Sequence, residues 1–347
     1  MKLQRSLDIA SDGDERGTAP VVRIISIRTL FSFVLALAAI ILVITNFNFD
    51  LKGIIQNIKH TNPLLYLTAL VFYYFSIFLR SLRWRILAVN ATTKALSSIQ
   101  IPALMRTSQF MLIGWFVNSI AGFRLGDIYK AYSFSQYTGS GFSWALGTIL
   151  AERIIDLAIL FLLLTTGLFL ASSTSMTQGW NYLIVSAALV GVSLGLLIAM
   201  RQFGIKLANL MPRKFKSAYQ NFHQGALGSF KQLPFILGLS MAIWMIDISR
   251  LIFVVHALDL SLTIPLAIVI TICHAILSSA PTPGGIGAVE IGLTTLLIFV
   301  GLDQSDAGAV VIIERSITYF SVIVIGGVAF LFWQISPVHR SVQKNRI

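Results

Sequence analysis

The chain has 347 residues, of which 56% are hydrophobic and only 12% are charged, and its mean hydropathy is +0.81. Soluble domains carry about 25% charged residues, so this composition excludes an ordinary soluble enzyme and indicates an all-α, polytopic membrane bundle. The net charge of +12 comes from basic residues at the ends of apolar runs. That distribution is typical of the positive-inside rule, not of nucleic-acid binding. No metal-ligand spacing or nucleotide-binding fingerprint occurs, so we expect neither a metal nor a cofactor.

The polar ends of the chain are expected to lie in the cytoplasm. Residues 1–22 are predicted to be disordered, because they are polar and contain glycine and proline, and residues 336–347 form a basic tail. Between them, residues 23–335 form one transmembrane domain with about seven crossings at roughly 20 residues each. The basic loop 201–233 contains no acidic residue and gives the strongest indication of orientation, with this loop in the cytoplasm.

Early spans are predicted over about 30–45, 63–79 and 181–199. The second of these ends in Arg80-Ser81-Leu82-Arg83-Trp84-Arg85. Arginine and tryptophan side chains at the end of a span favour an interfacial anchor. Arginine is also well suited to bind a lipid phosphate. We interpret the motif as an anchor and keep phosphate binding as the alternative.

A break and a charged span lie between these early spans. The apolar run 107–120 is followed by Ala121-Gly122-Phe123-Arg124-Leu125-Gly126-Asp127, and the long apolar run 142–171 comes next. This long run carries Glu152, Arg153 and Asp156. Ionisable residues inside a membrane span are costly, and they therefore usually have a function.

A further span, about 234–258, carries Asp247 and Arg250, which lie three positions apart and so share one helical face. His256 and His274 are single histidines in apolar runs. Such histidines are more often interior residues with a hydrogen-bond partner than ligands, and we assign neither a role.

A second break lies between the apolar runs 264–280 and 291–300, and it reads Pro281-Thr282-Pro283-Gly284-Gly285-Ile286-Gly287-Ala288-Val289-Glu290. Two prolines and three glycines do not continue a helix. Backbone without helical hydrogen bonds is tolerated at membrane depth only where protein or a water-filled cavity covers it. A broken apolar helix beside a carboxylate is typical of a transporter binding site. The alternative is a short cytoplasmic turn between two ordinary spans.

Two segments of the chain, about 107–171 and 262–333, resemble each other. In each, an apolar run leads to a glycine-rich break, an acid, and a Glu-Arg pair inside the next helix. Asp127 precedes Glu152 by 25 positions, and Glu290 precedes Glu314 by 24. The charge rule gives the two segments opposite orientations, which predicts inverted repeats. Because the arms 107–120 and 291–300 are short, we favour a broken or re-entrant hairpin in each repeat over three full spans.

If the two hairpins meet, the residues of both breaks converge on one polar cavity. The candidate substrate-binding residues are Arg124, Asp127, Glu152, Arg153, Asp156, Pro283, Gly284, Gly285, Glu290, Glu314 and Arg315. Adjacent residues on a helix do not face each other, so each arginine needs another partner. We expect pairs across the repeats, Arg153 with Glu314 or Glu290 and Arg315 with Glu152 or Asp127. The alternative is that these pairs only lock the helices together.

These motifs together resemble the transmembrane region of the lysylphosphatidylglycerol synthases. That region is the flippase-like half of the multiple peptide resistance factors, and it also occurs as a free-standing membrane protein. The resemblance covers about 28–333, and its most specific part is the Pro-Gly-Gly-Ile-Gly element before Glu290. The first break departs from the family pattern, because Asp127 stands where the family has glutamate. The soluble aminoacyl-transferring domain is absent, so the resemblance implies lipid handling and not lysine transfer.

We therefore expect a non-enzymatic protein of the cytoplasmic membrane. It would translocate or bind a lipid with a polar glyco-, phospho- or aminoacyl headgroup through an intramembrane cavity. The alternatives are a membrane enzyme with Asp127 or Glu290 as its base, or a scaffold, in a polyprenyl-linked or aminoacyl-lipid synthesis pathway. Membrane lipids are the expected partners, a separate synthase and a homo-oligomer are left open, and nucleic acid is not expected.

Overall fold

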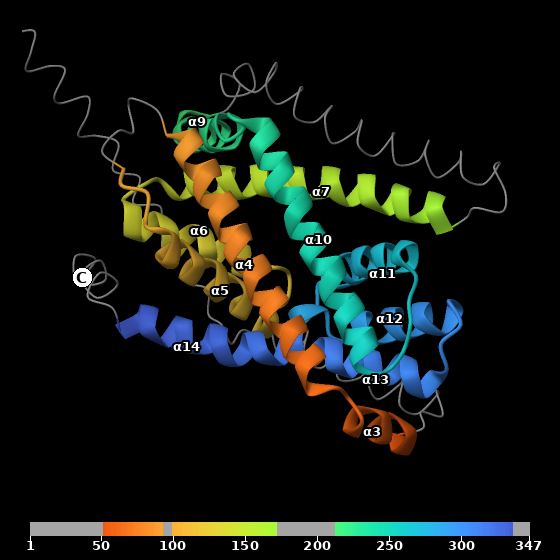
Figure 1. The fold of residues 1–347 in the computed structure, drawn as a ribbon. Helices are drawn as coiled ribbons and strands as arrows, with labels where there is room; N and C mark the ends of the chain where they lie inside the picture. The colour runs from red at the N-terminus through yellow and green to blue at the C-terminus, as the bar shows by residue number, and fades with distance from the viewer. Residues whose placement is uncertain (1–50, 93–98, 172–211, 336–347) are drawn as a thin grey trace, which may run out of the picture.

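The computed structural model describes residues 51–92, 99–171 and 212–335. Every element within these ranges is a helix, which confirms the predicted all-α membrane fold (Figure 1). The predicted spans at 30–45 and 181–199, the polar N-terminus 1–22 and the basic tail 336–347 lie outside the described residues.

Four helices of the described part are long and apolar enough to cross a membrane. They are α4 (Pro63–Ala91), α7 (Phe142–Ala171), α10 (Leu233–Ala257) and the run from α13 (Gln304–Arg315) through the π-helical turn η3 (Ser316–Phe320) into α14 (Ser321–Ile335). Figure 1 shows α4 and α10 side by side, crossing α7 and the α13–α14 run. We call the segment from α4 through α7 the first half and the segment from α10 through α14 the second half. Helices α4 and α10 therefore line the region where these two halves meet.

Helix α4 is longer than the sequence predicts. It begins at Pro63, where the missing N–H is harmless in the first turn, and the Asn62 side chain accepts hydrogen bonds from two first-turn N–H groups. It continues past residue 79 to Ala91, so the arginines of the predicted anchor lie inside the helix. The anchor interpretation is wrong for Arg83 and Trp84, since both side chains are fully buried.

Two short helical hairpins separate the long helices. The first consists of α5 (Leu104–Ile120) and α6 (Leu125–Thr138), and the second of α11 (Ile264–Leu277) and α12 (Ala288–Phe299). A helix of 14 residues spans about 21 Å, which is shorter than a hydrocarbon core of about 30 Å. The helices α6, α11 and α12 have at most this length, so they fit the expected hairpins better than single crossings.

The two hairpins turn in the same way with different residues. In the first, Phe123 and Arg124 have positive φ angles of 61° and 52°, and in the second Gly284, Gly285 and Gly287 have positive φ angles. Two observations require glycine at position 284. Its φ angle is +56°, and a Cβ there would lie 2.4 Å from the ring of Tyr319. Residues other than glycine rarely adopt a positive φ angle. Arg124 adopts one, and such a strained backbone persists only where the surrounding structure fixes it.

Each hairpin packs against the long helix of the other half. Helix α5 contacts α14, and α11 contacts α7. Both contacts are close, since a Cβ at Gly326 would lie 2.7 Å from Phe116 Cβ, and a Cβ at Gly167 would lie 2.9 Å from Ile268 Cγ2. Two related halves would pack against each other in this reciprocal way. The inverted duplication itself stays a prediction.

Two amphipathic helices lie at the periphery. Helix α3 (Leu51–Lys59) packs on α13, where Asn57 donates a hydrogen bond of 2.7 Å to Asp306. Helix α9 (Arg213–Gly228) occupies part of the predicted basic loop 201–233 and crosses α7. Gly147 and Gly225 allow this crossing, because a Cβ on either would lie 2.2 Å from a backbone oxygen of the other helix. A sequence rich in basic residues and without a long apolar run does not reveal such a contact.

Candidate functional site

A polar cavity of about 270 Å³ lies between the two halves. A single buried water needs only about 10–15 Å³ of such volume, so the cavity has room for a polar group and its hydration. Arg80 and Asp247, on its wall, lie near the middle of the two long helices α4 and α10. The charged residues that line it are Arg80, Arg124, Arg153, Asp156, Asp247, Arg250 and Arg315, and they share the wall with Tyr73, Trp115, Trp244 and Tyr319.

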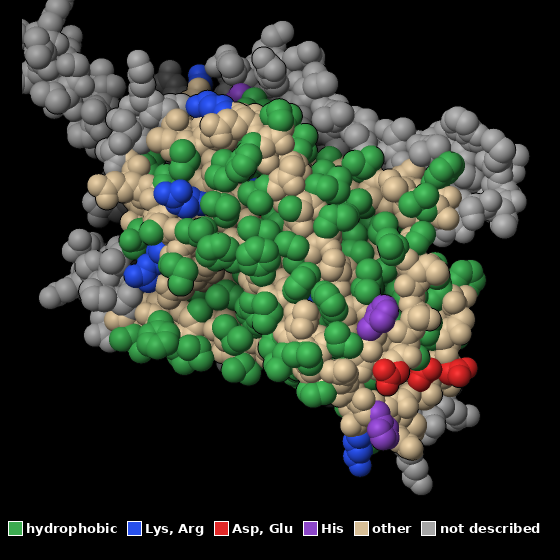
Figure 2. Space-filling view, in the orientation of Figure 1, with side chains coloured by type: hydrophobic (Ala, Val, Ile, Leu, Met, Phe, Trp, Pro, Cys, Tyr) green, Lys and Arg blue, Asp and Glu red, His purple; other side chains and the backbone are tan. Residues whose placement is uncertain are grey.

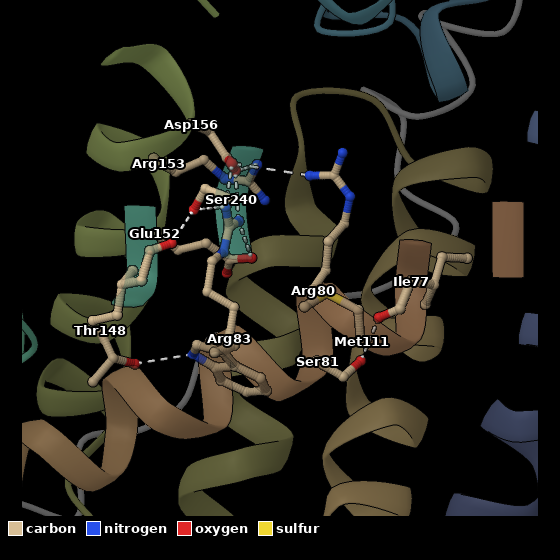
Figure 3. A network of polar contacts seen from close by, with 12 residues as sticks. Ile77, Arg80, Ser81, Arg83, Met111, Thr148, Glu152, Arg153, Asp156 and Ser240 are labelled. Carbon is tan, nitrogen blue, oxygen red and sulfur yellow. Dashed lines mark hydrogen bonds and ion pairs between the residues drawn. The ribbon is translucent and has the colours of Figure 1, made fainter. Parts of the chain in front are cut away.

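In the first half, Arg83 holds two carboxylates of α7. Its Nη1 and Nη2 lie 2.7 Å and 3.0 Å from the two oxygens of Asp156, and Nη2 lies 3.2 Å from Oε1 of Glu152 (Figure 3). Arg83 also donates to Ser240 of α10 at 2.9 Å. Because both carboxylates are almost fully buried, this fork of hydrogen bonds replaces the water that their charges lose.

Two further cations complete the first half. Lys130 of α6 is fully buried, and its Nζ lies 2.7 Å from Oε2 of Glu152 and 4.2 Å from the ring centroid of Trp84. Arg153 donates from Nη2 to Asp127 Oδ1 at 2.9 Å. This ion pair connects Asp127, at the start of α6, to α7. Arg153 also lines the cavity.

The second half repeats this plan. Arg250 of α10 donates to Oε2 of the fully buried Glu314, whose other oxygen lies 3.1 Å from Nδ1 of His274. Arg315 Nε lies 2.7 Å from Glu290 Oε1, and Arg315 Nη1 donates to the carbonyl of Gly284 at 3.0 Å. Glu290 also accepts the N–H of Gly287 at 2.7 Å, which fixes the start of α12.

The two halves therefore contain the same four charges in the same order. An arginine of the long helix before the hairpin (Arg83 or Arg250) binds a buried glutamate, and the arginine after that glutamate binds the acid three residues into the second hairpin helix. Arg80 and Asp247 precede Arg83 and Arg250 by three positions each, and they pair with each other at 2.5 Å. This pair is a direct ionic link between the halves.

The expected pairing across the repeats is wrong. Arg153 binds Asp127 of its own half and not Glu290 or Glu314, and Arg315 binds Glu290 and not Glu152 or Asp127. The reason is local: each hairpin's second helix begins beside the arginine that follows it in the chain. Across the halves, the described ion pairs run from α4 to α10, which the sequence argument did not use.

The predicted site residues fall into three groups. Arg124, Arg153, Asp156, Gly284 and Arg315 line the cavity. Behind this lining, the acids Asp127, Glu152, Glu290 and Glu314 bind cations of the wall or of the adjoining core. Pro283 and Gly285 are buried and shape the second break. Sequence reasoning did not assign Arg80, Arg83, Lys130, Asp247, Arg250 or His274 to the site.

A signal for some of these missed residues was present in the sequence. Arg80 and Arg83 have the same spacing as Asp247 and Arg250, and each pair lies in the long helix ahead of a hairpin. Comparing these two helices would have extended both repeats toward the N-terminus. His274 has no counterpart histidine in the first half, so a search for repeated residues does not find it.

The charge of the cavity wall is positive. Asp156 and Asp247 are held by Arg83 and Arg80, whereas Arg124 donates to the Ser279 hydroxyl at 2.5 Å and has no carboxylate within ion-pair distance in the described part of the chain. In addition, Arg315 Nη2 and His274 Nε2 are buried without a hydrogen-bond partner. Among the described residues, no group of histidine, cysteine and acids could hold a metal ion. The wall is therefore suited to an anionic or strongly polar group.

Comparison with known proteins gives relatives from archaea. The chain is 30% identical to a UPF0104 membrane protein of Methanocaldococcus jannaschii over 221 residues, 62% of this chain and 93% of the relative. It is 24% identical to a UPF0104 membrane protein of Methanothermobacter thermautotrophicus over 340 residues, 90% and 96% of the two chains. A UPF0104 membrane protein of Pyrococcus horikoshii is 21% identical over 297 residues, 76% and 86% of the two chains. No solved structure matches the chain.

The family profile of the lysylphosphatidylglycerol synthase transmembrane region matches residues 30–326. This range includes both hairpins, both buried glutamates and the ionic link between α4 and α10. The chain is thus an integral membrane protein that belongs to the family of the lysylphosphatidylglycerol synthase transmembrane region.

Proposed function

We propose that this protein moves a lipid with a polar, phosphate-bearing headgroup across the membrane. The headgroup passes through the cavity between the two halves while the acyl chains stay in the bilayer. The observation that carries the proposal is the arginine-rich polar cavity at the level where the long apolar helices cross.

The energetics of crossing support this reading. A polar headgroup that enters hydrocarbon loses its hydration, which costs several kcal/mol or more for a charged group. The cavity wall offers arginine and aromatic side chains that replace this water. Because Arg80, Arg153 and Arg315 of the wall are already paired with acids, the protein holds these three charges at this depth without isolating them.

The outer surface supports it as well. Leu64, Leu67, Val71 and Phe75 of α4 are exposed and recur at helical spacing, so they form an apolar stripe on the outside of the bundle. Figure 2 shows hydrophobic side chains over most of this face, with charged side chains toward its edges. Acyl chains could follow such a surface while the headgroup occupies the cavity.

The arrangement of the halves supports movement rather than simple binding. Broken helices that meet near the middle of a bundle are the common architecture of secondary transporters. Here the ionic link between the two long helices is the pair of Arg80 with Asp247, and both residues line the cavity. A phosphate that competes for Arg80 would weaken this link and favour a change in the relative position of the halves.

The test is lipid translocation in proteoliposomes of phosphatidylcholine and phosphatidylglycerol that contain a fluorescent phosphatidylglycerol. Purified protein should raise translocation above protein-free vesicles. Arg315→Gln should lower the rate about tenfold, the effect of losing a charge-assisted hydrogen bond of roughly 1.5 kcal/mol.

The matched control is Arg106→Gln. Arg106 contacts Gln109 and lies outside the cavity, so its rate should equal that of the wild type. Well-folded wild-type protein that moves no lipid above the blank would refute the proposal. Equal rates for Arg315→Gln and the wild type would remove the cavity arginine from it.

A further inference from the structure

The two halves differ in the second base beside the buried glutamate. In the first half, Lys130 reaches Glu152 at 2.7 Å, and in the second half, His274 reaches Glu314 at 3.1 Å. Each glutamate also binds one arginine, Arg83 or Arg250. The glutamate of the first half therefore has an arginine and a lysine as partners, whereas that of the second half has an arginine and a histidine, the side chain whose ordinary pKa lies nearest neutral pH.

This difference is an exchange of two positions between the halves. The acids Asp127 and Glu290 lie 163 positions apart, and the same offset relates the starts of α6 and α12 at Leu125 and Ala288. It also relates Met111 to His274 and Lys130 to Leu293. In the first half, the base Lys130 lies on the second hairpin helix α6, and Met111 lies on the first, α5. In the second half, the base His274 lies on the first hairpin helix α11, and Leu293 lies on the second, α12.

The apolar member of each pair fills the corresponding place. Met111 is buried and contacts Lys130 through its sulfur at 3.5 Å, and Leu293 is fully buried in the core. Replacing lysine by leucine would leave a glutamate without its second cation unless a base were supplied from elsewhere. His274 supplies it from α11, so the exchange is compensated and the histidine has a defined task.

We propose that His274 and Glu314 form a proton-binding site that sets the charge of the second half of the cavity. Histidine is the side chain that changes charge near neutral pH. His274 lines the cavity, and its Nε2 is buried without a hydrogen-bond partner. Thr271, one turn earlier on α11, also lines the cavity with an unpartnered hydroxyl. A proton therefore has a path from the cavity to an imidazole whose other nitrogen already faces a carboxylate.

The neighbouring charges leave Glu314 as the partner of that proton. Of the carboxylates on the elements packed around α11, Asp247 on α10 is bound by Arg80, Asp156 on α7 by Arg83, and Glu290 on α12 by Arg315. The cations that share the cavity wall with His274 are Arg80, Arg124, Arg153, Arg250 and Arg315. Tyr73 on α4 contacts Arg250 through its ring. With neutral His274, Glu314 is balanced by Arg250, and protonation adds one positive charge to the wall.

This proton site has a consequence that rests on the proposed function. An added positive charge strengthens the hold on an anionic headgroup, and its loss weakens that hold. Proton release on one side of the membrane would then favour headgroup release. Translocation should accordingly depend on pH and on a proton gradient.

The first experiment reads protonation directly. The protein carries five histidines, so NMR of the histidine-labelled protein in nanodiscs should assign the His274 signal as the one absent from His274→Gln. His256→Gln is the matched control, since His256 is exposed and its Nδ1 lies 2.8 Å from the Ile252 carbonyl of its own helix. We expect the His274 signal to change reversibly with pH, because histidine is the side chain that changes charge near neutral pH. A His274 signal that does not respond to pH would overturn the proposal.

The second experiment measures translocation of fluorescent phosphatidylglycerol in the same vesicles as above. The wild-type rate should change roughly three- to tenfold between acidic and mildly alkaline pH, as one partly screened charge near an anion predicts. The double variant His274→Met with Leu293→Lys rebuilds the arrangement of the first half and should translocate at a rate independent of pH.

The outcomes separate the two proposals. A wild-type rate that is flat with pH, or a double variant that keeps the wild-type pH dependence, would overturn the coupling. If no variant moves lipid while His274 titrates as expected, the proposed function fails and the proton site stands.

Discussion

The Arg83 fork offers the sharpest test of what holds the buried charges of the first half together. Arg83→Met keeps most of the side-chain volume but removes the bidentate partner of Asp156, which then keeps only the longer contacts with Arg153 at 3.7 Å and Arg80 at 4.0 Å. Among the described residues, Glu152 keeps its ion pair with Lys130. Removing one partner of a buried ion pair typically costs about 3–5 kcal/mol, because the remaining charge stays buried without its partner. Since the Arg83 side chain is fully buried, solvent does not screen this loss.

The assay is reversible unfolding of the purified protein in mixed micelles, with increasing amounts of a denaturing detergent. The matched control is Arg85→Gln, two residues further along α4, which removes one hydrogen bond from Nε to the Pro102 carbonyl. This control should cost only about 1 kcal/mol. Adding Asp156→Asn to Arg83→Met should restore part of the loss, because the buried carboxylate that lost its bidentate partner is gone.

The reasoning would be refuted if Arg83→Met cost no more than Arg85→Gln. It would also be refuted if neutralising Asp156 gave no recovery, since the loss would then come from packing and not from an unpaired carboxylate.

Two further predictions concern the backbone and the packing of the halves. Gly284→Ala should destabilise the protein by at least about 1–2 kcal/mol from the left-handed backbone alone, while Gly238→Ala on α10, where a Cβ meets no atom within 4 Å, should be neutral or slightly stabilising in the same unfolding assay. Equal effects would contradict the assigned geometry of the break. With the single native cysteine replaced (Cys273→Ser), the pair Gly167→Cys and Ile268→Cys should form a disulfide between α7 and α11, because a shift of a few tenths of an ångström brings their Cβ separation from 3.2 Å into the range of about 3.5–4.5 Å that disulfides need. Mass spectrometry of the cross-linked peptide reads the result, and cross-linking no better than with Gly238→Cys in place of Gly167→Cys would contradict the contact.

The features that the sequence predicts correctly are those that local chemistry determines. The apolar runs give α7 and α10 with bounds within a few residues, because length and hydropathy decide a span. The break after Pro281 follows from proline and glycine, whose backbone properties act without tertiary context. Glu290 binds Arg315, which lines the cavity, although the sequence predicted Glu152 or Asp127 as the partner of Arg315.

The features that it misses depend on which faces meet. An arginine at the end of a predicted span has the same local signal whether it anchors at the interface or turns inward. Arg83 is buried because α4 continues for two more turns and packs against α7 and α10. The partner of Arg153 likewise depends on where α6 begins in space, which residue spacing does not determine. His274 becomes visible only when Glu314 is placed beside it.

The link between Arg80 and Asp247 bears on how such a chain can arise. On an axis that relates two like segments, a given position meets its own counterpart. Two arginines or two aspartates would then repel each other beside the cavity. If the predicted duplication took place, two identical polypeptides could not have made this contact. A single chain that carries both segments can place opposite charges at the paired positions, so each segment pairs with the other and not with a second copy of itself.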